Sequence, residues 1–226
     1  MTFHILTLFP EMITECTNHS ILGRAQKSEL IKINPVNIRD FAINKHGQVD
    51  DAPYGGGAGM VMMAPPIFDA YKSLPVAEST PVIYLSPQGK VLTQKKAQEL
   101  ANLPELVLLC GHYEGIDERI IEEIVTEEIS IGDYVLTGGE PAALVLMDAI
   151  SRLVPGVLGK EESHMDESFS GEMPLLEYPQ YTRPPEFNGR KVPEILLSGH
   201  HKNIDTWRRQ EAAKRTKLKR PDLTIY

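Results

Sequence analysis

Leu106-Val107-Leu108-Leu109-Cys110-Gly111-His112-Tyr113-Glu114-Gly115 is the stretch that decides the fold class. A short apolar run bounded by turn residues is typical of a strand that is buried on both faces, as in parallel sheets. The glycine-flanked segment after it is typical of a loop at the carboxyl end of such a strand, where α/β sheets bind their ligands. The sequence therefore predicts a buried strand over residues 106–110 that leads into a ligand-binding loop.

The same pattern occurs on both sides of this stretch. A predicted strand over residues 81–85 leads into Ser86-Pro87-Gln88-Gly89, and a predicted strand over residues 129–136 leads into Thr137-Gly138-Gly139-Glu140. Any one of these loops alone is typical of a tight turn. Three of them in one domain predict a single pocket assembled from all three, because glycine lets backbone approach a ligand closely.

The surrounding elements alternate between strand and helix. Thr93 and Asp117 stand where helix N-caps are expected. Such alternation predicts an α/β domain with a mainly parallel sheet. The other predicted strands cover residues 3–9 and 31–38, and the predicted helices cover residues 21–30, 67–74, 93–101, 117–125 and 140–153.

Composition excludes several classes of protein. No stretch approaches the roughly 18 apolar residues of a membrane helix, and the polar Thr2 and His4 argue against a secretory signal peptide. Cys16 and Cys110 have no ligand-like spacing, nor do the histidines, so we expect no structural metal site. We expect a cytoplasmic protein with no membrane partner.

The chain of 226 residues has a net charge of −8, but the charge is unevenly distributed. Residues 198–220 carry eight Lys/Arg against two Asp/Glu on a predicted helix. A solvated helix face shows such a pattern, and a phosphate-binding surface requires it. Because residues 160–171 are polar and poor in aliphatics, we expect a domain over residues 1–160, a flexible linker over 161–174 and a C-terminal domain over 175–226.

The common nucleotide-binding signatures are absent. Gly55-Gly56-Gly57-Ala58-Gly59 follows no strand, and Gly89-Lys90 lacks the remaining residues of a P-loop. The three loops hold no lysine or arginine cluster for a triphosphate. A ligand held by backbone groups and apolar walls, such as adenosine with a sulfonium tail, fits them better than the FMN or ATP of a flavodoxin-like enzyme.

Several long motifs, in order along nearly the whole chain, resemble the TrmD-type tRNA (guanine-N1)-methyltransferases. The most specific of them are Tyr84-Leu85-Ser86-Pro87-Gln88-Gly89, Cys110-Gly111-His112-Tyr113-Glu114-Gly115-Ile116-Asp117-Glu118-Arg119, Ser130-Ile131-Gly132-Asp133-Tyr134-Val135-Leu136, Pro155-Gly156-Val157-Leu158-Gly159 and Tyr181-Thr182-Arg183-Pro184.

The resemblance implies a SPOUT-type α/β fold: a knotted parallel-sheet domain followed by a small, mainly helical C-terminal domain, assembled as a homodimer. General topology rules make knots nearly absent, so only the resemblance predicts this one. It also implies that the knot binds S-adenosylmethionine (SAM). The implied SAM-binding residues are Tyr84, Leu85, Ser86, Pro87, Gly111, Tyr113, Glu114, Ile131, Gly132, Asp133, Tyr134, Val135, Leu136, Gly138 and Gly139.

Methylation at guanine N1 requires a base, because N1 carries a proton near neutral pH, and negative charge then builds on O6. In the family, an aspartate directly before the pair Ser168-Phe169 is the base. Here that position is Glu167, with Asp166 one step earlier as the alternative. Arg152 matches the arginine that stabilises charge on the base. Without the resemblance, Glu167 and Asp166 would be interpreted as solvated acids of the linker, and Arg152 as an arginine favoured at a helix end by the helix dipole.

The resemblance further implies a tRNA partner with a guanosine immediately 3′ of the anticodon. Asp50 and Gly59 match positions that read the preceding guanosine, and Glu114 matches an acid that helps place the Mg²⁺ on which the family's activity depends. His112 stands where close relatives often have arginine. We expect further tRNA contacts in the C-terminal domain from Arg183, Arg208 and Arg215.

Two rival hypotheses remain beside this one. The replacement of the family's aspartate by Glu167 is compatible with a catalytically idle module that binds SAM or RNA. A SPOUT enzyme with a different RNA target is the other.

Overall fold

The computed structural model describes residues 1–159, 167–169 and 175–224. The chain divides into two compact units, Met1–Gly159 and Lys160–Tyr226, and each is described separately.

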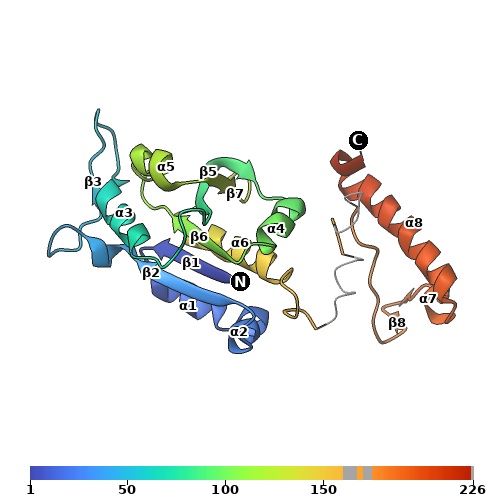
Figure 1. Ribbon diagram of the computed structural model, residues 1–226. Helices are drawn as coiled ribbons and strands as arrows, with labels where there is room; N and C mark the ends of the chain where they lie inside the picture. Colours follow the sequence, from blue (N-terminus) through green and yellow to red (C-terminus); the bar gives the residue numbers. More distant parts are fainter. Residues whose placement is uncertain (160–166, 170–174, 225–226) are drawn as a thin grey trace. The chain divides into compact units, whose positions relative to one another are not determined.

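The N-terminal unit is built on a five-stranded sheet with the strand order β2-β1-β6-β5-β7 (Figure 1). Every neighbouring pair is parallel, as predicted. The predicted buried strand is β6, and it lies in the middle of the sheet. The strands are β1 (Thr2–Thr7), β2 (Lys32–Asn37), β5 (Val82–Val91), β6 (Glu105–Cys110) and β7 (Glu127–Ser130).

Helices cover both faces of the sheet because each parallel connection must cross over it. Alternate residues of a strand therefore enter two different cores: Leu106 and Leu108 pack on one face, and Val107 and Leu109 on the other. Helices α1 (Pro10–Thr17), α2 (Ser20–Lys27), α4 (Gln94–Ala101) and α6 (Glu140–Ser151) cover the first face, and α3 (Ala64–Lys72) and α5 (Glu118–Ile124) cover the second.

The predicted caps are confirmed. Thr93 Oγ1 accepts a hydrogen bond from Lys96 N at 3.2 Å, at the start of α4. Asp117 Oδ1 accepts one from Arg119 N at 3.0 Å, at the start of α5. Each bond satisfies a backbone donor that the helix leaves unpaired, which is why these helices begin where they do.

The predicted strand over residues 129–136 is wrong beyond Ser130, where β7 ends. Gly132 has a φ of +147°, and its backbone NH donates to Ser130 Oγ at 3.1 Å. Tyr134 N then donates back to Gly132 O at 2.9 Å. These local hydrogen bonds replace the sheet ladder, so the apolar residues after Ser130 form a loop.

Among the other boundaries that differ from the predictions are those of the first strand and of β5. The first strand ends at Thr7, and the chain continues into α1, a helix with proline in its first turn that the sequence analysis missed. Strand β5 continues to Val91, because Leu85 and Lys90 both pair with Ile129 and the residues between them form an excursion from the strand.

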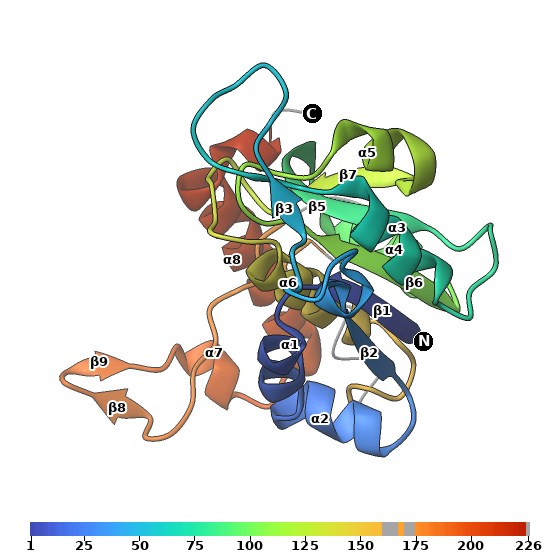
Figure 2. The same ribbon diagram turned by 90° about the vertical axis from the view of Figure 1, so that its left-hand side faces the viewer.

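A small hairpin extends from this unit (Figure 2). It consists of β3 (Asp50–Asp51) and β4 (Val61–Met62), which pair antiparallel. Met62 N donates to Gly115 O and Asp117 N donates to Met62 O, both at 3.0 Å. The base of the hairpin is therefore attached to the loop that follows β6. A short 3-10 helix, η1 (Ile38–Phe41), follows β2.

The C-terminal unit is mainly helical, as predicted. It contains β8 (Glu186–Phe187), β9 (Arg190–Lys191), α7 (Glu194–Leu197), α8 (His201–Lys219) and η3 (Pro221–Thr224). The predicted basic helix is α8. An extended segment packs along it: Leu176 N donates to Thr216 Oγ1 at 2.8 Å, and the Arg208 guanidinium lies 4.7 Å from the Tyr178 ring centroid.

Candidate functional site

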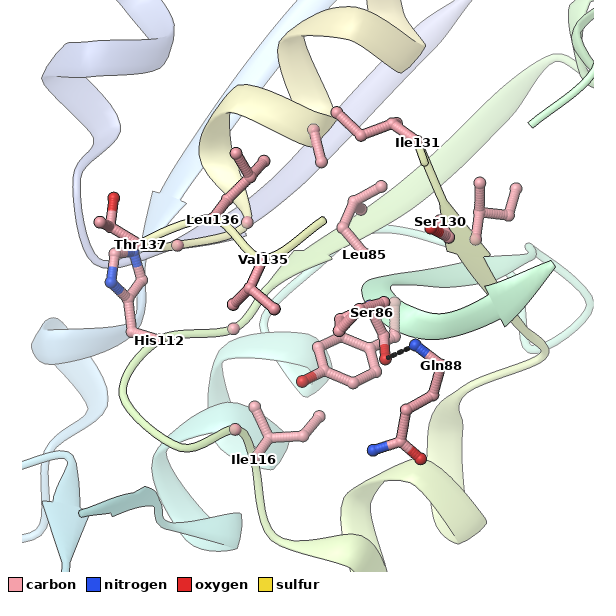
Figure 3. A pocket seen from close by; sticks show the side chains of 18 of the residues that line it. Leu85, Ser86, Gln88, His112, Ile116, Ser130, Ile131, Val135, Leu136 and Thr137 are labelled. Atoms are coloured by element: carbon pink, nitrogen blue, oxygen red, sulfur yellow. Dashed lines mark hydrogen bonds between the residues drawn. The ribbon is translucent and has the colours of Figure 1, made fainter. Parts of the chain in front are cut away.

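A pocket of about 390 Å³ lies at the carboxyl ends of β5, β6 and β7 (Figure 3). Its walls come from the three loops that the sequence analysis singled out, together with one side of α5 and the first turn of α6. Figure 3 shows His112 and Thr137 at one end of the pocket and Ser130 and Ile131 at another, with Leu85 and Val135 between them.

The first loop is the excursion in β5. Ser86 Oγ accepts a hydrogen bond from Gln88 N at 3.1 Å, which closes a tight turn (Figure 3). A Cβ atom at Gly89 would lie 2.5 Å from Glu128 O, so only glycine lets the strand rejoin β7 at this point. The turn thereby directs Ser86 and Pro87 into the pocket.

The second loop follows β6 and packs against Tyr84. A Cβ atom at Gly111 would lie 2.8 Å from the Tyr84 hydroxyl oxygen, so the loop backbone and the phenol are in close contact. The pKa of Tyr84 is raised to about 12, mainly by burial and to a smaller extent by the nearby carboxylates of Glu128 and Glu118. The phenol therefore stays protonated near neutral pH and remains a hydrogen-bond donor.

The third loop lies directly on the second. Gly139 N donates to Gly111 O at 2.9 Å, and His112 and Gly138 form an isolated antiparallel bridge. A Cβ atom at Gly139 would lie 2.7 Å from Cys110 Cα. Two walls of the pocket are thus backbone, held together without space for side chains.

The charge of the lining is acidic. Glu114 and Glu118 line the pocket, and no lysine or arginine of the described residues lines it. A site with this charge disfavours phosphate groups and favours a ligand that is neutral or positive. Arg39 does not line the pocket, but its Nη2 donates to the hydroxyl oxygen of the lining residue Tyr113 at 3.4 Å.

The structure gathers in this pocket every residue predicted to bind the cofactor except Asp133. Sequence reasoning missed several lining residues. Most of them, such as His112 and Ser130, belong to the recognised motifs, and Thr137 directly follows one, so their place in these motifs was the available signal. Glu118 and Ile121 reach the pocket from α5, and only the packing of that helix shows this. The remaining missed residues are Gln88, Gly115, Ile116, Ile129, Ser130 and Ala142.

Two of the predicted tRNA-binding positions lie on the hairpin. Asp50 is the half-buried first residue of β3. Gly59 has a φ of +86°, and a Cβ atom there would lie 2.5 Å from Glu114 Cγ. The structure therefore places a predicted tRNA-reading position in contact with a residue of the pocket.

The predicted catalytic residues Arg152 and Glu167 lie in different units of the chain. Arg152 is the C-cap residue of α6, at the opposite end of that helix from the pocket. Glu167 is half-buried in the C-terminal unit, where Glu177 N donates to Ser168 Oγ and Phe169 N donates to Leu175 O, both at 2.9 Å. The alternative base, Asp166, lies outside the described residues.

The predicted tRNA contacts of the C-terminal unit have different surroundings. Arg183 is exposed and Arg215 is half-buried. Arg208 stacks on Tyr178 and also lies 3.6 Å from Asp205 Oδ1, so its guanidinium has a structural role within the unit. Within the described ranges, no three His, Cys, Asp or Glu side chains are placed to hold a metal ion.

Comparison with known proteins identifies the family. The family described as tRNA (guanine-1)-methyltransferase TrmD matches residues 1–225. The chain belongs to the TrmD family. This membership confirms both the resemblance and the SPOUT-type α/β fold, and it argues against a flavodoxin-like enzyme.

Curated TrmD relatives are similar over nearly their full lengths. A protein of Ruminiclostridium cellulolyticum named tRNA (guanine-N(1)-)-methyltransferase is 62% identical over 99% of this chain and 96% of its own length. Proteins with the same name from Staphylococcus carnosus and Staphylococcus aureus strain JH9 are 58% and 57% identical, over 99% of this chain and 90% of theirs. Across the residues that the structure describes, no helix of this TrmD protein is long and apolar enough to cross a membrane.

Proposed function

We propose that this enzyme transfers the methyl group of SAM to N1 of the guanosine immediately 3′ of the anticodon of a tRNA. The observation that carries the proposal is the acidic pocket of three glycine loops, which no lysine or arginine lines in the part of the chain that the structure describes, together with membership of the TrmD family. When bound, SAM supplies an electrophilic methyl group on a positively charged sulfur.

The pocket residues fit such a ligand. The backbone walls at Gly111, Gly138 and Gly139 carry no side chains, which suits the close approach of a flat ring such as adenine. Glu114 and Glu118 favour the positive charge of a sulfonium. Leu85, Ile131 and Val135 contribute apolar walls, which exclude water from the methyl group.

We propose that these loops form the trefoil knot of the SPOUT fold. Two packing contacts between backbone segments support this proposal. The β5 excursion packs on the backbone of β7, and residues 138–139 lie on the backbone of Gly111 and Cys110. Chain segments in this arrangement pass against one another with no room for side chains.

Glu167 is our candidate for the base that removes the N1 proton. The hydrogen bonds of Ser168 and Phe169 to the segment at residues 175–177 hold its neighbouring backbone on the C-terminal unit, which gives the carboxylate a defined place there. Asp166 remains the alternative. Arg152 would stabilise negative charge on the base.

We propose that the active site is shared between two protomers of a homodimer. Helix α6 has 12 residues, so its ends are about 18 Å apart. One end lines the pocket and the other carries Arg152, so Arg152 is poorly placed for the pocket of its own chain. A second copy would cover the exposed apolar side chains Phe9 and Met12 near α1 and Val145 on α6, two helices that pack together.

The tRNA would be held by the C-terminal unit and by the hairpin. Exposed basic side chains on α8, among them Lys202, Arg209 and Lys217, suit contacts with phosphates. Asp50 and Gly59 are our candidates for reading the preceding guanosine. A tRNA substrate also places the enzyme in the cytoplasm.

Mg²⁺ is a further proposal. Among the described residues, the pocket offers the carboxylates of Glu114 and Glu118 and no third acidic ligand. Mg²⁺ is commonly held by one or two carboxylates and completes its shell with water and substrate oxygens, so these residues fit a weakly held ion.

The test is a single-turnover methylation assay with purified protein, labelled SAM and a tRNA transcript, with detection of 1-methylguanosine. A matched transcript with adenosine 3′ of the anticodon is the control, and it should stay unmethylated. Absence of 1-methylguanosine with the first transcript would support the idle-module hypothesis, and methylation elsewhere in the transcript would support a different RNA target.

The base is assigned by substitution in the same assay. Glu167→Gln should lower the single-turnover rate by about 10²–10⁴-fold, the usual contribution of a well-placed base. Asp166→Asn is the matched control and should leave the rate near that of the wild type. The reverse pattern would assign the base to Asp166, and full rates for both variants would rule out a linker carboxylate.

A further inference from the structure

A buried carboxylate lies directly beside the pocket without being part of its lining. Glu140 is the first residue of α6, and its side chain is 1% exposed. Thr7 Oγ1 donates to Glu140 Oε1, and His112 Nε2 lies at hydrogen-bond distance from Glu140 Oε2, each at 2.6 Å. The three residues come from the end of β1, the loop after β6 and the start of α6.

A second contact of the Thr7 hydroxyl shows the direction of its hydrogen bond to Glu140. Phe9 N donates to Thr7 Oγ1 at 2.9 Å, and the hydroxyl proton of Thr7 is directed to Glu140. A carboxylate accepts at both oxygens, and the His112 tautomer that carries a proton on Nε2 can donate it to Glu140. An ionised group in the first turn of α6 also interacts favourably with the helix dipole. Both oxygens of this buried acid are therefore satisfied by specific partners.

The same residues hold the two backbone walls of the pocket together. His112 bridges to Gly138, and a Cβ atom at Gly138 would overlap the His112 ring. Glu140 directly follows Gly139, whose NH donates to Gly111 O. The carboxylate thus connects the loop that contains Gly111 to the loop that contains Gly138 and Gly139, and it attaches both to the end of β1.

We propose that Glu140, with His112 and Thr7, is a positioning residue that holds the donor pocket in its binding geometry and thereby sets the affinity for SAM. This inference rests on the proposed function, because it requires SAM to occupy the pocket. Glu140 acts through the backbone of the two loops, and pre-formed loops spare the ligand the cost of ordering them.

The experiment is a calorimetric titration of SAM into the wild type, Glu140→Ala, Glu140→Gln and Thr7→Val, together with methylation kinetics. Loss of hydrogen bonds to a charged group predicts a rise in Kd of about 10- to 100-fold for Glu140→Ala. Glu140→Gln should recover part of the affinity, because its amide oxygen still accepts from Thr7. Thr7→Val should raise Kd by about tenfold.

Thr17→Val is the matched control. Thr17 is a buried threonine of the same unit whose hydroxyl donates to Ile13 O at 2.8 Å, within α1. Thr17→Val should lower the melting temperature by about as much as Thr7→Val does, without changing the Kd for SAM. If any Glu140 variant does not fold, Thr7→Val against Thr17→Val still decides the question.

A positioning role predicts that Kd and KM for SAM rise while kcat at saturating SAM changes little. General destabilisation would instead lower the binding stoichiometry and kcat at an unchanged Kd, and that result would overturn the inference. If Glu140→Ala and Thr7→Val bound SAM with the same Kd as the wild type, the inference would be overturned and the proposed function would stand. A wild-type protein that binds no SAM would overturn the proposed function as well.

Discussion

Replacing Gly139 by alanine is a sharp steric perturbation of the pocket. Gly139 has a φ of −78°, which alanine adopts freely, so the substitution introduces no backbone strain of its own. The new Cβ would lie 2.7 Å from Cys110 Cα, 3.0 Å from Gly111 N and 3.1 Å from Cys110 Cβ. All three atoms belong to a buried strand end and the loop directly after it.

The magnitude follows from these distances. Ordinary contacts begin at 3.4 Å, so the third loop must move by about 0.7 Å from the second. That movement stretches the Gly139 N to Gly111 O hydrogen bond, worth about 1 kcal/mol, and overpacking costs typically 1–3 kcal/mol. Binding sites require placement to within about 0.5 Å, so we expect the Kd for SAM to rise at least tenfold, or about 1.4 kcal/mol.

The assay is calorimetric titration of SAM, with thermal unfolding monitored on the same samples. Gly159→Ala is the matched control, because a Cβ atom there has no neighbour within 4 Å among the described residues. It should leave Kd unchanged. If folded Gly139→Ala bound SAM as tightly as the wild type, the backbone walls described here would not be the SAM-binding surface.

Three further outcomes follow from single sites. The pKa of Tyr84 is raised, mainly by burial, to about 12, above the unfolded value near 10, so its contribution to stability is present below pH 10 and is lost as the pH rises through 12. Tyr84→Phe should reduce this alkaline loss, which is about 3 kcal/mol at most, as measured by urea unfolding across that pH range. Thr93→Ala removes the N-cap of α4 and should cost about 1 kcal/mol of stability without changing methylation, and a loss of methylation in folded protein would contradict the structural role of Thr93. Arg215→Ala should weaken tRNA binding and lower the slope of log affinity against log salt by about 1, whereas an unchanged slope would exclude a phosphate contact there.

Local sequence patterns predicted elements whose determinants are local. The buried strand at residues 106–110, the caps at Thr93 and Asp117 and the basic helix α8 all depend on runs, spacings and capping residues within a few positions. The prediction of a strand over residues 129–136 was wrong because it also used only a local pattern. A short apolar run occurs both in buried strands and in loops that line a pocket. The single glycine at position 132 was not sufficient to predict the turn there.

The sequence by itself determined the fold class, the three loops and the family, because motif order and residue type are properties of the chain alone. Only the tertiary structure decided which distant residues meet: Glu140 with Thr7 and His112, and Gly59 with Glu114. The physical reason is that such contacts depend on the strand order β2-β1-β6-β5-β7 and on crossover packing. Periodicity shows which face of an element is buried, but it carries no information about the element that covers it.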